Sequence, residues 1–140
     1  MDKRLRVAIN GFGRIGRAFL KVAIDNENIE IVAINDLGNV HNLSYLLQYD
    51  SVYRVSPFDV YAEVHGVNRG QEDEGRRTVS TSEQYLIIKH GDTESRVKVL
   101  QEKDPSLLPW KEMNVDVVVE STGLFTSYDK ANTHIKAGAK

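Results

Sequence analysis

The chain has 140 residues, a formal net charge of −2 and a charged fraction of 27%, which are ordinary values for one globular domain. This charge balance gives no broad attraction to nucleic acid or to an anionic membrane. The sequence contains no cysteine and its four histidines are widely spaced, so a cysteine nucleophile is excluded within these residues and no metal site is predicted. No apolar run reaches the roughly 18 residues of a membrane-spanning helix, and the first residues lack a secretory signal. We therefore expect a cytoplasmic domain without a membrane or nucleic-acid partner.

The first 36 residues predict a strand, a helix and a second strand in succession. Residues 5–10 form a short apolar run that precedes a glycine-rich turn, and the next segment has apolar residues at helical spacing. The residues expected on the apolar face of this helix are Ile15, Phe19, Val22 and Ala23. The apolar run at 29–35 is typical of a parallel strand that is covered on both faces. The pattern therefore predicts a βαβ unit.

The remaining sequence predicts further elements of an α/β domain. They are a helix at 42–49, strands at 85–89 and 96–100, a loop at 103–110, a buried strand at 115–120 and a helix at 128–137. A turn at 90–92 would join the two central strands as a β-hairpin, and Gly138 would end the last helix. The charged, glycine-containing stretch at 69–77 is expected to be a solvent-exposed loop.

Three glycines in the first turn have the spacing of a dinucleotide-binding motif, G-x-G-x-x-G. Gly11 would permit a tight turn, Gly13 would let the backbone approach a pyrophosphate, and Gly16 would let helix and strand pack closely. The start of the helix would then offer free N–H groups and a partial positive charge to the phosphates. Although the motif alone is weak, its position between a predicted strand and a predicted helix favours this interpretation over a plain tight turn.

Two further segments are candidates for contacts with a dinucleotide. Asp36 follows the second strand, where an acidic residue accepts hydrogen bonds from ribose hydroxyls and opposes a 2′-phosphate, so NAD is favoured over NADP. The alternative is an ordinary turn-forming aspartate at the end of a strand. Residues 120–123 lie at the carboxyl end of the buried strand predicted at 115–120, at the edge of the sheet where ligands bind in open α/β folds. A plain strand-to-helix turn explains that segment equally well.

Several segments, in order, resemble the N-terminal part of the glyceraldehyde-3-phosphate dehydrogenase family. They are VAINGFGRIGR at 7–17, IVAIND at 31–36, YLLQYDSV at 45–52, QEKDP at 101–105, VVVESTGLFT at 117–126, and Lys130 with KAGAK at 136–140. The resemblance implies an α/β fold of the Rossmann type, with a mainly parallel sheet and an added β-hairpin region. It also implies that residues 1–140 are an NAD-binding domain and that an unusual insertion lies around 55–78, for which a surface elaboration is the plainest interpretation.

The resemblance implies a function that this chain would serve only in part. The family oxidises and phosphorylates glyceraldehyde 3-phosphate with NAD to 1,3-bisphosphoglycerate in glycolysis, as a cytoplasmic homotetramer. The family's cysteine nucleophile matches no residue here, so this chain alone is expected to supply the NAD site and to be inactive. Erythrose-4-phosphate dehydrogenase shares the same opening motifs and remains an alternative, as does a non-catalytic nucleotide-binding module.

The cofactor-binding candidates come from the motifs and from the resemblance together. They are Asn10, Gly11, Phe12, Gly13, Arg14, Ile15, Gly16, Asn35, Asp36, Lys103, Ser121, Thr122, Gly123 and Phe125. By resemblance, Arg14 and Ile15 would meet the pyrophosphate and Lys103 would lie near the adenine. Thr122, Gly123 and Phe125 would line the nicotinamide end of the cleft. No catalytic residue is predicted within the chain.

Overall fold

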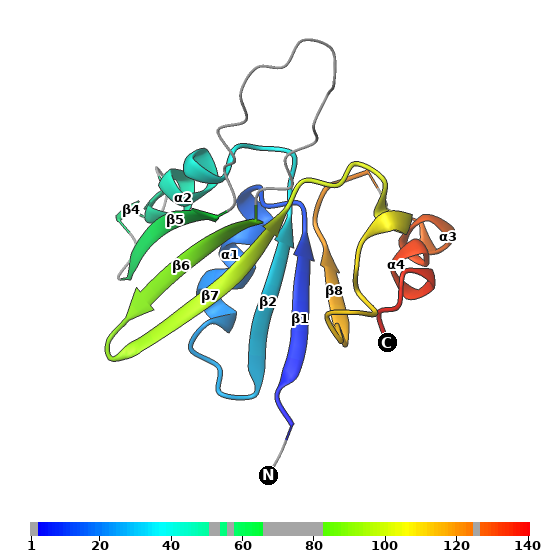
Figure 1. Ribbon diagram of the computed structural model, residues 1–140, viewed down its shortest axis with the longest axis horizontal. Helices are drawn as coiled ribbons and strands as arrows, with labels where there is room; N and C mark the ends of the chain where they lie inside the picture. Colours follow the sequence, from blue (N-terminus) through cyan, green and yellow to red (C-terminus); the bar gives the residue numbers. More distant parts are fainter. Residues whose placement is uncertain (1–2, 51–53, 56–57, 66–82, 125–126) are drawn as a thin grey trace.

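The computed structural model describes residues 3–50, 54–55, 58–65, 83–124 and 127–140. The chain alternates strands and helices at its start, adds an antiparallel section in the middle, and ends in two short helices (Figure 1). The elements are β1 Leu5–Asn10, α1 Arg14–Ala23, β2 Ile29–Asn35, α2 Val40–Gln48, β3 Tyr49–Asp50, β4 Arg54–Val55, β5 Asp59–His65, β6 Glu83–His90, β7 Thr93–Leu100, the 3₁₀ helix η1 Pro105–Leu107, β8 Val117–Glu120, α3 Tyr128–Ala131 and α4 Thr133–Lys136. No helix in these ranges is long and apolar enough to cross a membrane.

Six of the described strands form one mixed sheet in the order β5-β6-β7-β2-β1-β8. The neighbours β7, β2, β1 and β8 run parallel to one another, whereas β6 is antiparallel to both β5 and β7. The fold is therefore an α/β fold of the Rossmann type with an added hairpin, as the sequence predicts. Since β1, β2 and β8 are parallel, their carboxyl ends share the edge that carries their arrowheads in Figure 1.

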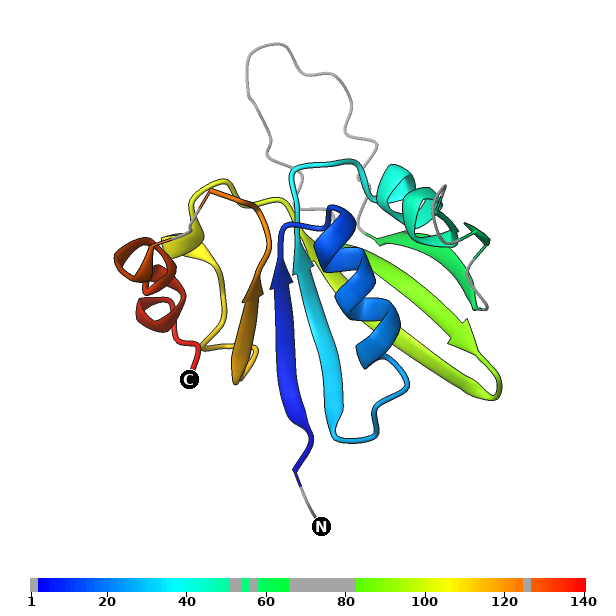
Figure 2. The ribbon, with the colours of Figure 1, turned by 180° about the vertical axis from the view of Figure 1, so that it is seen from behind.

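Two apolar clusters cover the two faces of the sheet. The larger joins alternate residues of the central strands to α1 and α2, which lie in front of the sheet in Figure 2. The smaller lies on the opposite face and centres on Trp110, which is fully buried against Ala8, Ala33 and Val115. Burial on both faces explains why β2 is an uninterrupted apolar run.

The predicted apolar face of α1 is wrong in two of its four residues. Ile15 and Val22 have exposed fractions of 72% and 81%, whereas the buried residues of the helix are Gly16, Leu20 and Ala23. These three lie at i, i+4 and i+7, so the predicted helical spacing was correct, but the buried face of the helix was not. The reason is the close contact at Gly16, where a Cβ atom would lie 2.4 Å from the Gly11 carbonyl oxygen. That contact turns the Gly16 face toward the sheet.

The buried strand predicted at 115–120 and the last predicted helix also differ from expectation. Within the described residues β8 pairs only with β1, and Val117 is 39% exposed, so β8 is an edge strand here rather than a fully buried one. The last helix is two short helices, α3 and α4, which meet at Asn132. The chain turns there because α4 buries His134 against Trp110, whereas α3 buries none of its residues. Gly138 has φ +112° and ends this region, as predicted.

The middle of the chain combines a confirmed hairpin with an unpredicted strand. β6 and β7 pair around Gly91, whose φ of +57° suits the predicted turn. Within the expected insertion at 55–78, residues 59–65 form β5, which pairs with β6 along its full length. Residues 66–82, including the predicted loop at 69–77, lie outside the described residues.

Candidate dinucleotide-binding site

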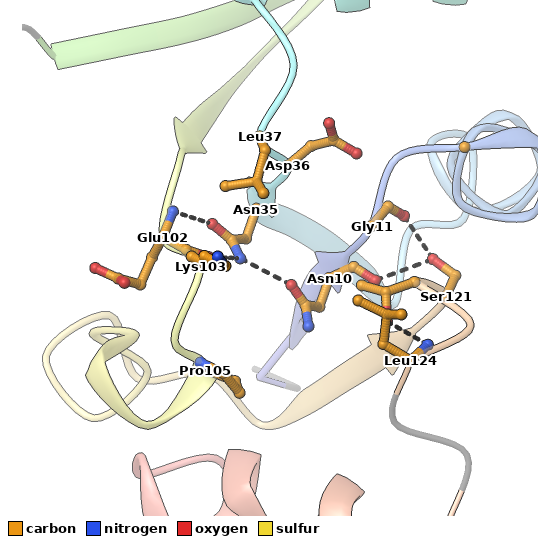
Figure 3. A pocket seen from close by; sticks show the side chains of 12 residues that line it. Asn10, Gly11, Asn35, Asp36, Leu37, Glu102, Lys103, Pro105, Ser121 and Leu124 are labelled. Carbon is orange, nitrogen blue, oxygen red and sulfur yellow. Dashed lines mark hydrogen bonds between the residues drawn. The ribbon is translucent and has the colours of Figure 1, made fainter.

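A pocket of about 390 Å³ opens at the carboxyl ends of β1, β2, β7 and β8 (Figure 3). It is lined by Asn10, Gly11, Gly13, Asn35, Asp36, Leu37, Glu102, Lys103, Pro105, Ser121, Thr122 and Leu124. These residues come from four loops that are far apart in the sequence. Parallel pairing brings them together because it places the ends of all four strands on one edge.

The three motif glycines occupy three different environments. Gly11 has φ +90°, and a Cβ atom there would lie 2.7 Å from the Thr122 nitrogen, so this turn admits only glycine. Gly16 packs α1 onto the turn. Gly13 has φ −80°, which any residue can adopt, and apart from its chain neighbours a Cβ atom there would meet no atom of the described residues within 4 Å. Neither the backbone nor the packing of the protein therefore requires glycine at position 13, and what would need the space is a ligand.

The N-terminus of α1 faces this open space without a side-chain cap. Gly13 is the N-cap residue, no side chain in the described part of the chain accepts a hydrogen bond from the first turn, and that turn contains no acidic residue. The first N–H groups of a helix have no intrahelical acceptor, and they carry a partial positive charge. Uncapped N–H groups beside a glycine without packing neighbours form a ready cradle for a phosphate.

Asp36 lies at the end of β2 and connects the glycine turn to the next loop. One carboxylate oxygen accepts a hydrogen bond from the Phe12 N–H at 2.8 Å, and the other accepts one from the Gly38 N–H at 2.8 Å. A carboxylate has about four acceptor positions, so each oxygen keeps room for one more donor. The side chain is therefore held in place while it retains two acceptors for a ligand such as a ribose diol.

The floor of the pocket is formed by the amide side chains of Asn10 and Asn35, which are hydrogen-bonded to each other. Asn35 Nδ2 donates to Asn10 Oδ1 at 2.8 Å and to the Glu102 carbonyl at 2.9 Å, and Asn35 Oδ1 accepts from the Glu102 N–H at 2.8 Å (Figure 3). Asn10 and Asn35 are both buried. Because their polar atoms are used within the protein, these two residues shape the floor rather than offer free groups.

The β8 side of the pocket is organised around Glu120. Its Oε1 accepts hydrogen bonds from both the N–H and the hydroxyl of Thr122, and its Oε2 accepts one from Asn10 at 2.8 Å and one from His134 at 2.5 Å. Burial alone would raise the pKa of this carboxyl group, but hydrogen bonds from His134, Thr122 and Asn10 outweigh burial and hold the pKa below its ordinary value. Ser121 adds a 2.6 Å hydrogen bond from its hydroxyl to the Gly11 carbonyl. The loop after β8 is thus bound to the glycine turn.

The sequence-predicted residues fall into three groups in the structure. The candidates that line the pocket are Asn10, Gly11, Gly13, Asn35, Asp36, Lys103, Ser121 and Thr122. Phe12 has its side chain in the core, and Arg14 and Ile15 are exposed at the start of α1, so for these three the structure brings only the backbone segment to the site. Gly16 packs behind the turn and Gly123 is exposed with φ +77°. Phe125 lies outside the described residues.

The pocket contains four residues that sequence reasoning missed, Leu37, Glu102, Pro105 and Leu124. Leu37 directly follows Asp36, and Leu124 lies two residues after Thr122, so position alone could have suggested them. Glu102 and Pro105 flank Lys103 in a segment that carried the family resemblance. No chemical property of leucine or proline marks a binding site, so the signal was weak.

This geometry defines a class of protein, an α/β domain that binds a dinucleotide across a glycine turn at the edge of its sheet. Comparison with known proteins then gives the family. A sequence model described as "Glyceraldehyde 3-phosphate dehydrogenase, NAD binding domain" matches residues 5–128. The chain therefore belongs to this family of NAD-binding domains, and NAD is the family's cofactor.

Curated relatives agree with this assignment. The chain is 44% identical over 139 residues to a glyceraldehyde-3-phosphate dehydrogenase of Mycoplasma pneumoniae, and the match covers 99% of the chain. It is 43% identical over 137 residues to that of Thermotoga maritima, covering 96% of the chain. It is 43% identical over 136 residues to the cytosolic enzyme of Trypanosoma brucei brucei, covering 97% of the chain. In each case the chain spans 34% of the length of the relative.

Proposed function

We propose that this chain binds NAD and serves as the NAD-binding part of a phosphorylating glyceraldehyde-3-phosphate dehydrogenase. That enzyme oxidises glyceraldehyde 3-phosphate with NAD and inorganic phosphate. The observation that carries the proposal is the open space at Gly13, between the uncapped start of α1 and the remaining acceptor positions of Asp36. The distribution of partial charge supports it, because a helix N-terminus suits a pyrophosphate and a carboxylate suits a ribose diol.

Each half of the cofactor has its own set of residues in this proposal. The N–H groups at the start of α1 bind the pyrophosphate, and Asp36 accepts the hydroxyls of the adenosine ribose. The adenine lies against Leu37 and Pro105 with Lys103 beside it, since these three residues line the pocket from the loops that follow β2 and β7, the first of which also carries Asp36. The loop after β8 forms the wall toward the nicotinamide. When bound, NAD supplies the hydride acceptor, and the residues of this chain bind and orient it.

The proposal also covers the setting in which this domain works. We propose a cytoplasmic protein, in line with the cytosolic relative, and a homotetramer with a small phosphorylated aldehyde as substrate. Because the sequence contains no cysteine, these residues cannot form a thiol adduct with an aldehyde. We therefore expect no NADH formation by this chain with glyceraldehyde 3-phosphate and phosphate. Absorbance that rises in proportion to the purified chain would contradict this expectation.

Calorimetric titration of the 140-residue chain with NAD and with NADP tests the proposed function. We expect saturable binding of one NAD per chain, and binding of NADP at least roughly tenfold weaker because the Asp36 carboxylate repels a 2′-phosphate. Circular dichroism before the titration establishes that the chain is folded. A folded chain that binds no NAD, or that binds NADP as tightly, would overturn the proposal.

A further inference from the structure

A chain of hydrogen bonds enters the site from the buried side of the molecule and ends at Glu120. The indole N–H of Trp110 lies 3.1 Å from His134 Nδ1. Since an indole nitrogen can only donate, Nδ1 must be the unprotonated nitrogen of the imidazole ring. The proton of a neutral His134 then lies on Nε2, which donates to Glu120 Oε2. Although these groups lie at ion-pair distance, the geometry describes a neutral imidazole bound to a carboxylate.

A second chain of hydrogen bonds reaches the same carboxylate from the opposite side of the pocket. The Glu102 N–H donates to Asn35, the Asn35 amide donates to Asn10, and the Asn10 amide donates to Glu120 Oε2. Asn10 Nδ2 also lies 3.4 Å from His134 Nε2, but with a proton on Nε2 its acceptor is the carboxylate. In both chains every donor points toward Glu120. The backbone N–H and carbonyl of Glu102 fix the orientation of the Asn35 amide, so both chains deliver hydrogens to the carboxylate of Glu120.

The other oxygen of Glu120 controls the loop that forms the β8 wall of the pocket. Oε1 accepts both polar hydrogens of Thr122, and the Thr122 hydroxyl in turn accepts the Leu124 N–H at 3.0 Å. The Thr122 nitrogen lies where a Cβ atom on Gly11 would be 2.7 Å away, so this loop rests directly on the glycine turn. The hydrogen bonds from Thr122 to Glu120 therefore set the width of the space between this loop and the glycine turn.

We propose that Glu120 is a positioning residue for the pyrophosphate and the distal ribose of the dinucleotide, which it serves by holding the Thr122 loop against the glycine turn. This inference rests on the proposed NAD-binding function. Two parts of the cofactor then contact different regions of the site. The adenosine monophosphate part is bound by the β1-α1-β2 unit and the loop after β7, and the remainder passes the wall that Glu120 holds in place.

A carboxylate is required at this position because all of its partners are donors. In Glu120→Gln, one end of the amide would present an N–H either to the two hydrogens of Thr122 or to the hydrogens of His134 and Asn10. His134 cannot become the acceptor, because Trp110 already occupies Nδ1. A buried donor facing a donor is costly, so the amide turns or the loop moves. Either change disturbs the wall while it leaves Asp36 and the start of α1 in place.

Asp116 offers a matched control at the opposite end of β8. Its side chain is 13% exposed, compared with 15% for Glu120, and it also accepts a backbone hydrogen bond, from the Arg6 N–H at 3.0 Å. Asp116 precedes β8, so it lies at the edge of the sheet away from the pocket. Asp116→Asn thus removes a comparable carboxylate without touching the site.

The experiment measures the binding of AMP, ADP-ribose and NAD by the wild-type chain, Glu120→Gln and Asp116→Asn. We expect Glu120→Gln to weaken ADP-ribose and NAD roughly tenfold and AMP less than about twofold, and Asp116→Asn to change none of the three. Thermal unfolding establishes that the variants are folded. If Glu120→Gln does not fold, Thr122→Val replaces it. This variant loses the hydroxyl that donates to Glu120 and accepts the Leu124 N–H, but it keeps the Thr122 N–H bond to Glu120. We expect the same ligand selectivity with a smaller loss.

A spectroscopic measurement tests the hydrogen-bond direction independently of ligands. Long-range ¹H–¹⁵N correlation at pH 8 should show His134 with its proton on Nε2, and the Nε2 resonance should shift in Glu120→Gln. A proton on Nδ1 in the wild type, or equal loss of all three ligands in Glu120→Gln, overturns the positioning role, as does no loss at all. A folded wild-type chain that binds none of the ligands overturns the proposed function and the positioning role together.

Discussion

The two sides of the pocket are built in opposite ways. On the β1-α1-β2 side, the helix start is uncapped, Gly13 has no packing neighbour, and the Asp36 oxygens keep acceptor positions. On the β8 side, the polar hydrogens of Thr122 and the Ser121 hydroxyl are already bound within the protein. The β1-α1-β2 side leaves hydrogen-bonding groups available to a ligand, whereas the polar groups on the β8 side hold the loop after β8 in place. Affinity should therefore come mainly from the first side and shape from the second.

The largest expected effect comes from filling the open space on the ligand-binding side. Gly13→Val should leave the fold intact, because apart from the chain neighbours of Gly13 no atom of the described residues lies within 4 Å of the new Cβ atom, and φ is −80°. The valine should block the approach of the pyrophosphate and weaken ADP-ribose and NAD by at least a hundredfold, or roughly 2.8 kcal/mol. Calorimetry measures the loss. Ala18→Val, on the exposed side of the same helix, is the control and should bind normally.

Substitution of a neighbouring glycine should give the converse result, a loss of stability. In Gly16→Ala the new Cβ atom would lie 2.4 Å from the Gly11 carbonyl oxygen. The helix must move away from the turn, which should cost about 1–3 kcal/mol of unfolding free energy. Urea denaturation compares this variant with Gly13→Ala, which should remain close to the wild type. Equal stability of the two variants would show that Gly16 does not set the helix position.

The carboxylate of Asp36 should account for the choice between NAD and NADP. A hydrogen bond to a charged group contributes about 1.5–3 kcal/mol, so Asp36→Ala should weaken NAD roughly ten- to a hundredfold and bring the two affinities close together. Parallel titrations with both cofactors measure the ratio. Asp92→Ala, an exposed residue of the hairpin turn, is the control. A variant that still excludes NADP would assign the selectivity to another residue.

A smaller effect should appear when the nicotinamide is removed from the ligand. Because the β8 wall has few free polar groups, we expect ADP-ribose and NAD to bind this chain within about threefold of each other. Competition titration against one labelled ligand resolves such a ratio. NAD binding tenfold or more tighter would mean that the wall offers the nicotinamide contacts absent from the described hydrogen bonds.

The smallest effect is the pH dependence that Glu120 adds to stability. In the folded chain the pKa of Glu120 lies below its ordinary value of about 4.3, which applies to the unfolded chain. The ionised carboxylate therefore contributes its full stabilisation of the fold above about pH 4.3, and this contribution is lost as the pH falls through the lowered pKa. Unfolding free energies should change little between pH 7 and pH 5 on its account. Below pH 4, Glu120→Gln should show a shallower loss of stability than the wild type. Identical slopes for both proteins would contradict this assignment.

The sequence by itself determined the features of this protein that depend on residues close together in the sequence. Strand β1, the glycine turn and strand β2 follow from contiguous patterns, and the positive φ at Gly11 confirms the turn that its glycine predicts. The approximate positions of α1, α2 and the β6–β7 hairpin follow in the same way. These features were predictable because backbone geometry and short-range periodicity act over a few residues.

Only the tertiary structure decided the contacts between segments distant in sequence. Which face of α1 is buried depends on the approach of Gly16 to Gly11, and the splitting of the last helix depends on the burial of His134 against Trp110. The central place of Glu120 depends on hydrogen bonds to Asn10, 110 residues away in the sequence, and to His134, 14 residues away. Neither partner lies within a local sequence pattern that includes Glu120, because strand pairing and helix packing alone bring them within hydrogen-bond distance.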